Sequence, residues 1–174
     1  MMKNYKMHNS LWILLLSIGM LFQSCKEIEC PLDNVVAMTV GLYQAENSQS
    51  LTLADTLTVK AVGTDSILLN RGIGLSSFLL PVRQTSTKDT LLLCFSNSKM
   101  QKAIDTIFVA HTNEPHFESV DCPPAVFHTI QSVAWTSHAL SQMPLTIDSV
   151  AVVRTKVNYD DVENLKVYLR STTL

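Results

Sequence analysis

The chain has 174 residues, of which 47% are apolar and 16% are charged, and this composition excludes a disordered protein. Its 13 Lys and Arg residues stand against 15 Asp and Glu, which gives a formal net charge of −2. Phosphate binding needs a clustered basic face, and the sequence shows no such cluster. The composition therefore argues against a nucleic-acid partner.

The first segment of the chain has the order of a lipoprotein signal peptide. Lys3 and Lys6 supply positive charge, residues 11–22 form an apolar run, and Cys25 follows. The run is too short to cross the hydrocarbon core of a membrane as a helix, which takes roughly 20 residues. We therefore expect residues 1–24 to be removed and a lipid to be attached to Cys25.

The residues just before the predicted cleavage point match a bacterial lipobox in part. Ser24 fits the position before the cysteine, whereas Phe22 and Gln23 stand where a leucine and a small residue are usual. Two alternatives stay open. One is an ordinary secretory signal followed by a chance cysteine, and the other is a helix that stays in the membrane.

The predicted mature chain is long enough for one domain with a single core. Cleavage before Cys25 leaves 150 residues, with 11 Lys and Arg against 15 acidic residues and a net charge of −4. We expect residues 25–33 to form a lipidated tether and residues 34–174 to form the folded domain.

Apolar and polar residues alternate with a period of two along this domain, which is typical of half-buried strands. In the first strand, Val36, Met38, Val40 and Leu42 share one face. Pro81 places its strand at a sheet edge or at a strand end, since proline lacks an amide donor. We expect strands over residues 36–43, 57–61, 67–69, 78–82, 90–95, 104–110, 126–135, 147–155 and 165–170.

Eight or nine short antiparallel strands, separated by turn-forming clusters, predict an all-β fold. We expect a single β-sandwich, immunoglobulin-like or related, with an open barrel as the alternative. The stretch 126–140 has the least regular period. Helices are expected to be limited to a turn or two, near residues 98–102 or 160–164.

Three cysteines remain besides Cys25. Because an exported protein folds in an oxidising compartment, each of them can be a free thiol or part of a disulfide. Cys94 lies in an apolar run and is expected to be a buried free thiol. Cys30 and Cys122 each precede a proline in a turn-rich segment, and we predict a disulfide between them. Closing that 92-residue loop corresponds to about 4 to 5 kcal/mol in the chain-entropy model. The alternative is that both stay reduced, and no C-x-x-C pair indicates zinc.

A triplet of Asp, then Ser or Thr, then an apolar residue occurs five times. Turn chemistry explains it, because Asp closes turns and a hydroxyl or β-branched residue opens the next strand. The triplet also resembles the O-glycosylation acceptor of exported Bacteroidota proteins, where a glycan adds bulk and solubility. The candidate O-glycosylation residues are Thr56, Ser66, Thr90, Thr106 and Ser149.

The order of motifs carries a family resemblance. Cys-Pro pairs at Cys30 and Cys122 enclose most of the short strands, and the chain closes with residues 147–150 (IDSV) and 165–169 (LKVYL). Over nearly the whole mature chain, this resembles Bacteroidota lipoproteins that carry a domain of unknown function. The resemblance implies an envelope lipoprotein without an assigned activity. Residues 26–29 (KEIE) also resemble the signal that sends such lipoproteins to the cell surface.

The sequence carries no P-loop and no dinucleotide fingerprint. Residues 74–78 (GLSSF) begin like a nucleophile elbow, but Phe78 replaces the second glycine. Asp160, Asp161 and Glu163 form an acidic cluster without the ligand spacing and glycine of a calcium loop. We therefore expect no catalytic residue, no metal site and no cofactor.

Four histidines of the mature chain could converge on a metal, but histidines spread over four segments are more typical of surface or hydrogen-bonded residues. They are His111, His116, His128 and His138.

The sequence carries a predicted lipid anchor and no catalytic motif. We therefore expect a non-catalytic lipoprotein of the outer membrane that faces the periplasm or the cell surface. We expect a binding or structural accessory to another envelope component, with contact residues such as Tyr43, Phe117 or Trp135. Its predicted partners are the membrane, through the N-terminal lipid, and an envelope protein. One alternative is a metal-dependent hydrolase or metal-handling protein that uses the histidines. Another is a fimbrial-like structural subunit. The sequence leaves the oligomeric state open.

Overall fold

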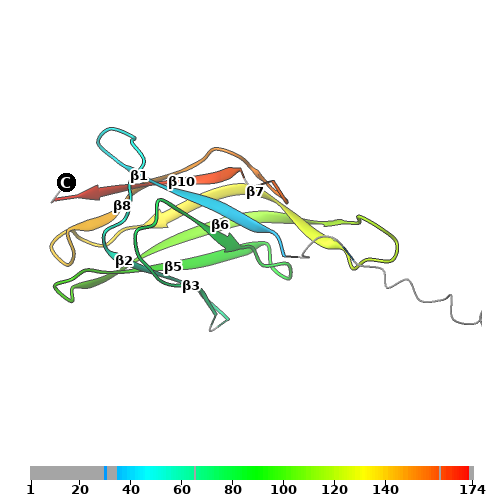
Figure 1. The fold of residues 1–174 in the computed structure, drawn as a ribbon, viewed down its shortest axis with the longest axis horizontal. Helices are drawn as coiled ribbons and strands as arrows, with labels where there is room; N and C mark the ends of the chain where they lie inside the picture. Colours follow the sequence, from blue (N-terminus) through cyan, green and yellow to red (C-terminus); the bar gives the residue numbers. More distant parts are fainter. Residues whose placement is uncertain (1–29, 31–34, 65, 161, 173–174) are drawn as a thin grey trace, which may run out of the picture. The chain divides into compact units, whose positions relative to one another are not determined.

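The computed structural model describes Cys30 and residues 35–64, 66–160 and 162–172 (Figure 1). Two compact units are distinguished, Met1–Pro31 and Leu32–Leu174, and every strand belongs to the second. The predicted signal peptide, Cys25 and residues 26–29 lie outside the described residues. The described part of the chain contains no helix that is long and apolar enough to cross a membrane.

One sheet has four strands in the order β4-β1-β10-β8. Its first and last strands in the sequence, β1 (Ala37–Gln44) and β10 (Glu163–Ser171), run parallel to each other. The edge strands β4 (Ser77–Pro81) and β8 (Leu145–Val152) pair antiparallel with β1 and β10 respectively. Pro81 is the last residue of an edge strand, as its missing amide donor predicted.

The other sheet has six antiparallel strands in the order β3-β2-β5-β6-β7-β9. Its strands are β2 (Thr56–Ala61), β3 (Ile67–Gly72), β5 (Lys88–Ser96), β6 (Lys102–His116), β7 (Ala125–Thr136) and β9 (Lys156–Val157). β6 and β7 form a hairpin that reaches beyond the ends of the neighbouring strands (Figure 1).

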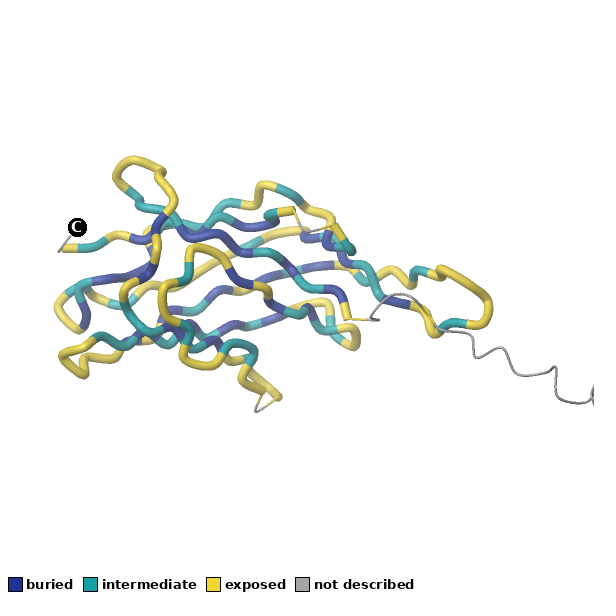
Figure 2. The backbone as a smooth tube through the Cα atoms, viewed as in Figure 1, coloured by how far each residue is buried: buried dark blue, intermediate teal, exposed yellow. Residues whose placement is uncertain are grey.

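The two sheets pack together as a β-sandwich, and the core lies between them (Figure 2). Alternation along each strand decides which side chains enter it. In β5 the odd positions point inward and the even positions point outward. The largest fully buried side chains are Phe95, Met38, Leu42, Leu53, Leu57, Leu80, Leu93, Ile107, Met143, Ile147, Leu165 and Leu169.

The register between β6 and β7 shifts within the hairpin. Ala110 pairs with Ser132 and His111 pairs with Ile130, so Gln131 is an extra residue in β7. Such a bulge reverses the inward and outward positions beyond it. Accordingly His128 and Ile130 are buried, whereas Val133 is the more buried residue on the far side of the bulge.

The predicted fold class, a single all-β sandwich, is confirmed, with three differences in detail. The described residues contain ten strands, one more than expected, because the two-residue strand β9 is too short to show alternation in the sequence. The β1–β10 pair is parallel rather than antiparallel. The helical turns expected near 98–102 and 160–164 are not found among the described residues. Asn97 instead closes a tight turn, where its Oδ1 accepts from the amides of Lys99 and Gln101.

Candidate functional site

A groove of about 530 Å³ lies on the outer face of the six-stranded sheet. Leu57 and Val59 point into the core, so the neighbouring positions of β2 point outward into the groove. Outward positions of β5 and β6, one residue of β3 and two residues of the β5–β6 turn complete it, and the inward-facing Phe95 and Ala103 also border it. The lining residues are Thr56, Thr58, Lys60, Arg71, Cys94, Phe95, Ser96, Asn97, Met100, Lys102, Ala103 and Ile104.

Three cations line this groove and no acidic residue does. Within the described residues, no carboxylate forms an ion pair with Lys60, Arg71 or Lys102, whereas four other cations are paired with carboxylates. Unpaired charges of one sign along a hollow add their fields and attract a counter-charge. The planar guanidinium of Arg71 also matches a carboxylate or phosphate in bidentate geometry. The groove therefore suits an anionic group.

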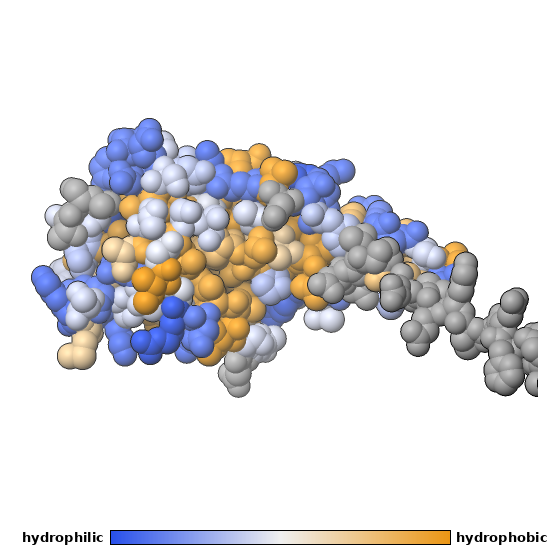
Figure 3. Space-filling view, viewed as in Figure 1, coloured by the Kyte–Doolittle hydropathy of each residue, from blue (hydrophilic) through white to orange (hydrophobic). Residues whose placement is uncertain are grey.

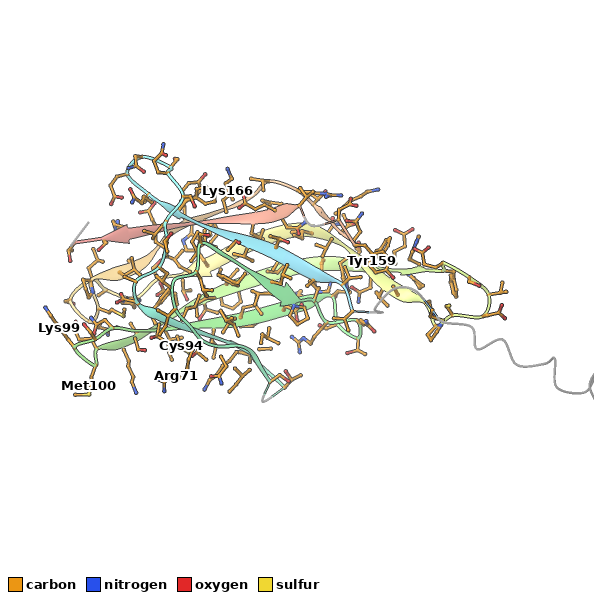
Figure 4. The ribbon with its side chains drawn as sticks, viewed as in Figure 1. Arg71, Cys94, Lys99, Met100, Tyr159 and Lys166 are labelled. Carbon is orange, nitrogen blue, oxygen red and sulfur yellow. The ribbon has the colours of Figure 1, made fainter. Side chains whose placement is uncertain are left out.

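The β5–β6 turn forms one end of the groove, and it carries Lys99 and Met100 (Figure 4). Met100 is 85% exposed and has a φ of 61°. This left-handed conformation is uncommon for residues other than glycine and occurs mainly in turns. Together with Ile104, Met100 gives the cationic groove an apolar rim.

Cys94 lies in the groove as a half-buried side chain, and it is the free cysteine among the described residues. Burial raises the pKa of its thiol, although the nearby charge of Lys60 acts in the opposite direction. The thiol therefore stays protonated at neutral pH, when a nucleophilic cysteine would need to be a thiolate. The prediction of a free thiol is confirmed, although Cys94 faces the outer groove and not the core.

An apolar surface adjoins the groove. The β2–β3 turn and the start of β3 expose Val62 and Ile67 beside the groove, whereas Leu79 points outward from the four-stranded sheet. A second hollow of about 430 Å³ contains Val62 and Ile67 and shares Lys60 with the cationic groove. In Figure 3, apolar side chains gather over the middle of the face shown, with hydrophilic ones beside them. Exposed apolar surface of this kind marks protein contacts.

Two of the four histidines are brought together. His111 and His128 are both buried, and each places Nδ1 2.8 Å from Oδ1 of Asn113. The amide nitrogen of Asn113 donates to the backbone carbonyls of Gln84 and Ser86, so its oxygen is the acceptor and both imidazoles donate.

The remaining nitrogen atoms of these rings do not form a metal site. Nε2 of His111 lies 3.2 Å from Oδ2 of Asp89, without the alignment of a hydrogen bond, and Nε2 of His128 has no hydrogen-bond partner in the described structure. Asp89 is also held by Arg83. No group of three metal-ligating side chains occurs within residues 35–64, 66–160 and 162–172.

The other two histidines lie in separate contacts. His138 donates to the buried carboxylate of Asp105, which also accepts from the Ile147 amide and the Thr146 hydroxyl. His116 lies 2.8 Å from Glu118 and stacks on Phe127, with ring centroids 4.1 Å apart. Each has the hydrogen-bonded role that the scattered spacing favoured.

The acidic cluster is divided between two contacts. Asp160 pairs with Arg154, which lowers the pKa of the carboxyl, and Glu163 accepts from the hydroxyl of Tyr43. Asp161 lies outside the described residues. Residues 74–78 pass from a loop into β4, which is the loop-to-strand context expected from the sequence and not a strand-to-helix elbow.

The five candidate glycosylation triplets have different environments. Asp89 and Asp105, which open the triplets of Thr90 and Thr106, are buried, so turn chemistry accounts for neither. Thr56 and Ser149 are half-buried, and Ser66 is exposed at the start of β3. Ser66 is therefore the most accessible hydroxyl of the five.

Cys30 and Cys122 form a disulfide, as the sequence predicted. The predicted contact aromatics, in contrast, do not gather. Phe117 follows the last residue of β6, whereas Trp135 pairs near its start, opposite Ile107, and Tyr43 belongs to the other sheet. Phe117 and Trp135 are thus separated by roughly 30 Å of strand.

The groove cations were not singled out from the sequence, although alternation gives a signal for two of them. Lys60 and Lys102 occupy outward positions of strands whose neighbouring residues are buried. Which outward residues share a groove depends on the strand order β3-β2-β5-β6, which alternation does not supply.

A protein-family model described as a family of unknown function, DUF6452, matches residues 56–169. The match begins with the first residue of β2 and ends within β10. No curated protein and no solved structure matches the chain.

Proposed function

The chain belongs to DUF6452, a family of unknown function, and we propose that it is a non-catalytic binding accessory of the bacterial envelope, anchored by a lipid on Cys25. One observation supports the binding role above all. The groove on the outer face of the six-stranded sheet has three cations without carboxylate partners, beside an exposed apolar segment.

The proposed location follows from the order of charge, apolar run and cysteine at the start of the sequence. A disulfide between Cys30 and Cys122 agrees with an oxidising compartment outside the cytoplasm. We assign the protein to the outer membrane, facing the periplasm or the cell surface, in keeping with its resemblance to Bacteroidota lipoproteins.

The proposed partner is another envelope protein with an acidic, partly apolar surface. The mature chain has a net charge of −4, so an acidic partner is repelled by most of the molecule and attracted only at the groove. Complementary charge of this kind fixes orientation and speeds association, while the exposed apolar side chains of Val62 and Ile67 supply buried area.

The absence of catalysis is part of the proposal, and two observations support it. The thiol of Cys94 is kept protonated by burial, the imidazoles of His111 and His128 are hydrogen-bonded to Asn113, and that of His138 is hydrogen-bonded to the buried Asp105. Nucleophiles and bases in enzymes are instead poised with an accessible reactive atom.

Binding of a fluorescent polyglutamate peptide, measured by anisotropy at low and moderate salt, tests the groove. The double variant Arg71→Glu/Lys102→Glu should weaken binding at least about tenfold, which is 1.4 kcal/mol, because attraction becomes repulsion. The double variant Lys88→Glu/Lys156→Glu reverses two exposed cations that do not line the groove and is the matched control. Equal loss of binding in both variants would show that the peptide senses net charge and not the groove.

A further inference from the structure

We infer that the loop between β6 and β7, residues 117–124, contacts the zwitterionic surface of the lipid leaflet that holds the anchor. This inference rests on the lipid attachment at Cys25 proposed above. The loop would be a second, non-covalent contact with the membrane, in addition to the lipid. No motif in the sequence indicates this contact.

The loop presents apolar side chains at the end of a projecting hairpin. β6 and β7 are the longest strands, and their connecting loop is largely exposed (Figures 1 and 2). Phe117 is 67% exposed and Val120 is 99% exposed. Burying side chains of this size contributes about 1.5 to 3 kcal/mol each, so their exposure on a loop tip points to a surface that covers them.

Covalent connections bring the anchor close to this loop. Cys122 of the loop is disulfide-bonded to Cys30, which is five residues after the predicted lipidated Cys25. Five extended residues span at most roughly 18 Å, and the two Cα atoms of a disulfide lie about 6 Å apart. The lipid-bearing residue therefore lies within roughly 24 Å of Cys122, whatever path the tether takes. Val120 is two residues from Cys122, so it lies within roughly 31 Å of the lipid-bearing residue.

Aromatic side chains pack together where β6 and β7 meet the loop, and this cluster would hold the loop in one orientation. The ring of His116 stacks on Phe127 at 14° between planes, and Tyr159 meets Phe127 edge-on with centroids 5.1 Å apart. A fixed orientation lowers the entropy that the loop loses when it contacts a surface.

The charges near the loop select the kind of leaflet. Glu114, Glu118 and Asp121 surround the tip, and no Lys or Arg lies between residues 103 and 153. An anionic leaflet would repel these carboxylates, whereas a zwitterionic one would not. Two apolar side chains bind a bilayer weakly by themselves, so the contact depends on the anchor, which raises their effective concentration at the surface.

Tryptophan fluorescence of the lipidated protein in vesicles tests this contact. The vesicles contain phosphatidylethanolamine and phosphatidylcholine with brominated acyl chains, which quench a tryptophan only at short range. In a Trp135→Phe background, Phe117→Trp places a reporter on the loop. Met100→Trp places a reporter that is at least as exposed beyond the other end of β6. The fifteen residues of β6 separate the two reporters by about 50 Å.

We expect the Phe117→Trp reporter to lose at least half of its emission in these vesicles and the Met100→Trp reporter to lose almost none. Adding Val120→Asp should restore most of the emission at position 117, while the protein stays bound to the vesicles. Equal emission from the two reporters would overturn the inference.

Flotation of the same vesicles separates this outcome from a failure of the proposed anchor. Protein that floats, with an unquenched reporter at position 117, keeps the anchor and overturns the loop contact. Protein that does not float, or a Cys25→Ser variant that floats as well as the parent, overturns the anchor and the inference that rests on it.

Discussion

At the scale of single residues, the side chain of Asn113 holds two buried imidazoles at once. Its oxygen accepts from His111 and His128, and the two rings meet edge to face with centroids 5.2 Å apart. Burial, assisted by the neighbouring His111, lowers the pKa of His128 to about 4. His128 is therefore neutral throughout the physiological range, and its protonation opposes folding.

This shift predicts a pH dependence of stability. The pKa of His128 is lower in the folded state than its usual 6.5, so its contribution is complete above pH 6.5 and is lost as the pH falls toward 4. Between pH 7 and pH 5 the free energy of unfolding should fall by about 2 kcal/mol through this residue. Urea unfolding at both pH values measures the change.

His128→Gln should flatten this dependence, because glutamine keeps a donor and does not titrate. His116→Gln is the control, since it removes a histidine whose side chain is 40% exposed. If the two variants lose stability with falling pH to the same extent as the parent, another group is responsible.

The cysteines show how far residue-level prediction reached. The flanking prolines and turn formers identified Cys30 and Cys122 as the disulfide pair. Cys94 was placed in the core because its neighbours Leu92, Leu93 and Phe95 are all apolar, yet it alternates with Phe95 and faces outward. Cys94 lies between Thr58 and Ile104 on the outer face, so an apolar run in the sequence contains a position that lines a cationic groove.

At the scale of elements, a glycine in β1 leaves space for side chains that lie over the β1–β10 pair. Gly41 pairs with Lys166, and a Cβ at this position would collide with the carboxylate of Glu163 and approach the Tyr43 ring to 2.9 Å. The hydroxyl of Tyr43 donates to the Glu163 carboxylate at 3.0 Å, and the ammonium group of Lys166 lies over the Tyr43 ring in a cation–π contact. Gly41 therefore makes room for the cross-strand contacts on this face.

Gly41→Ala should lower the free energy of unfolding by about 1 to 3 kcal/mol, as overpacking usually does, although alanine normally stabilises a strand relative to glycine. Chemical denaturation measures the loss. Glu163→Ala removes the colliding carboxylate, so the double variant should lose clearly less than the two single losses added together. Strict additivity would show that Gly41 is required for another reason.

The strands themselves were predicted well where alternation is unbroken, as in β1, β2 and β5. The stretch 126–140 looked irregular because the extra residue Gln131 reverses the inward face in the middle of β7. The parallel β1–β10 pair could not be predicted, because alternation shows which residues are buried and not which strands are neighbours.

At the scale of the whole molecule, strand order creates the candidate site. Lys60, Arg71 and Lys102 come from β2, β3 and β6 and share one groove only because β5 lies between β2 and β6. The histidines and carboxylates, which are the usual candidates for a site in a sequence, instead form internal hydrogen bonds such as those to Asn113 and Asp105. Isolated cations on separate strands carry no spacing signal, so this site could be found only from the structure.

Site-specific photo-crosslinking in cells that make the lipidated chain tests the proposed function most directly. A photoreactive residue at Ile104 reports on the groove, and one at Val153 reports on an exposed apolar position outside it. We predict a single envelope protein crosslinked from position 104 and not from 153. This crosslink should be lost in the Arg71→Glu/Lys102→Glu variant but not in the Lys88→Glu/Lys156→Glu variant. The same crosslinks from both positions, or a crosslink at 104 that survives charge reversal, would contradict the account.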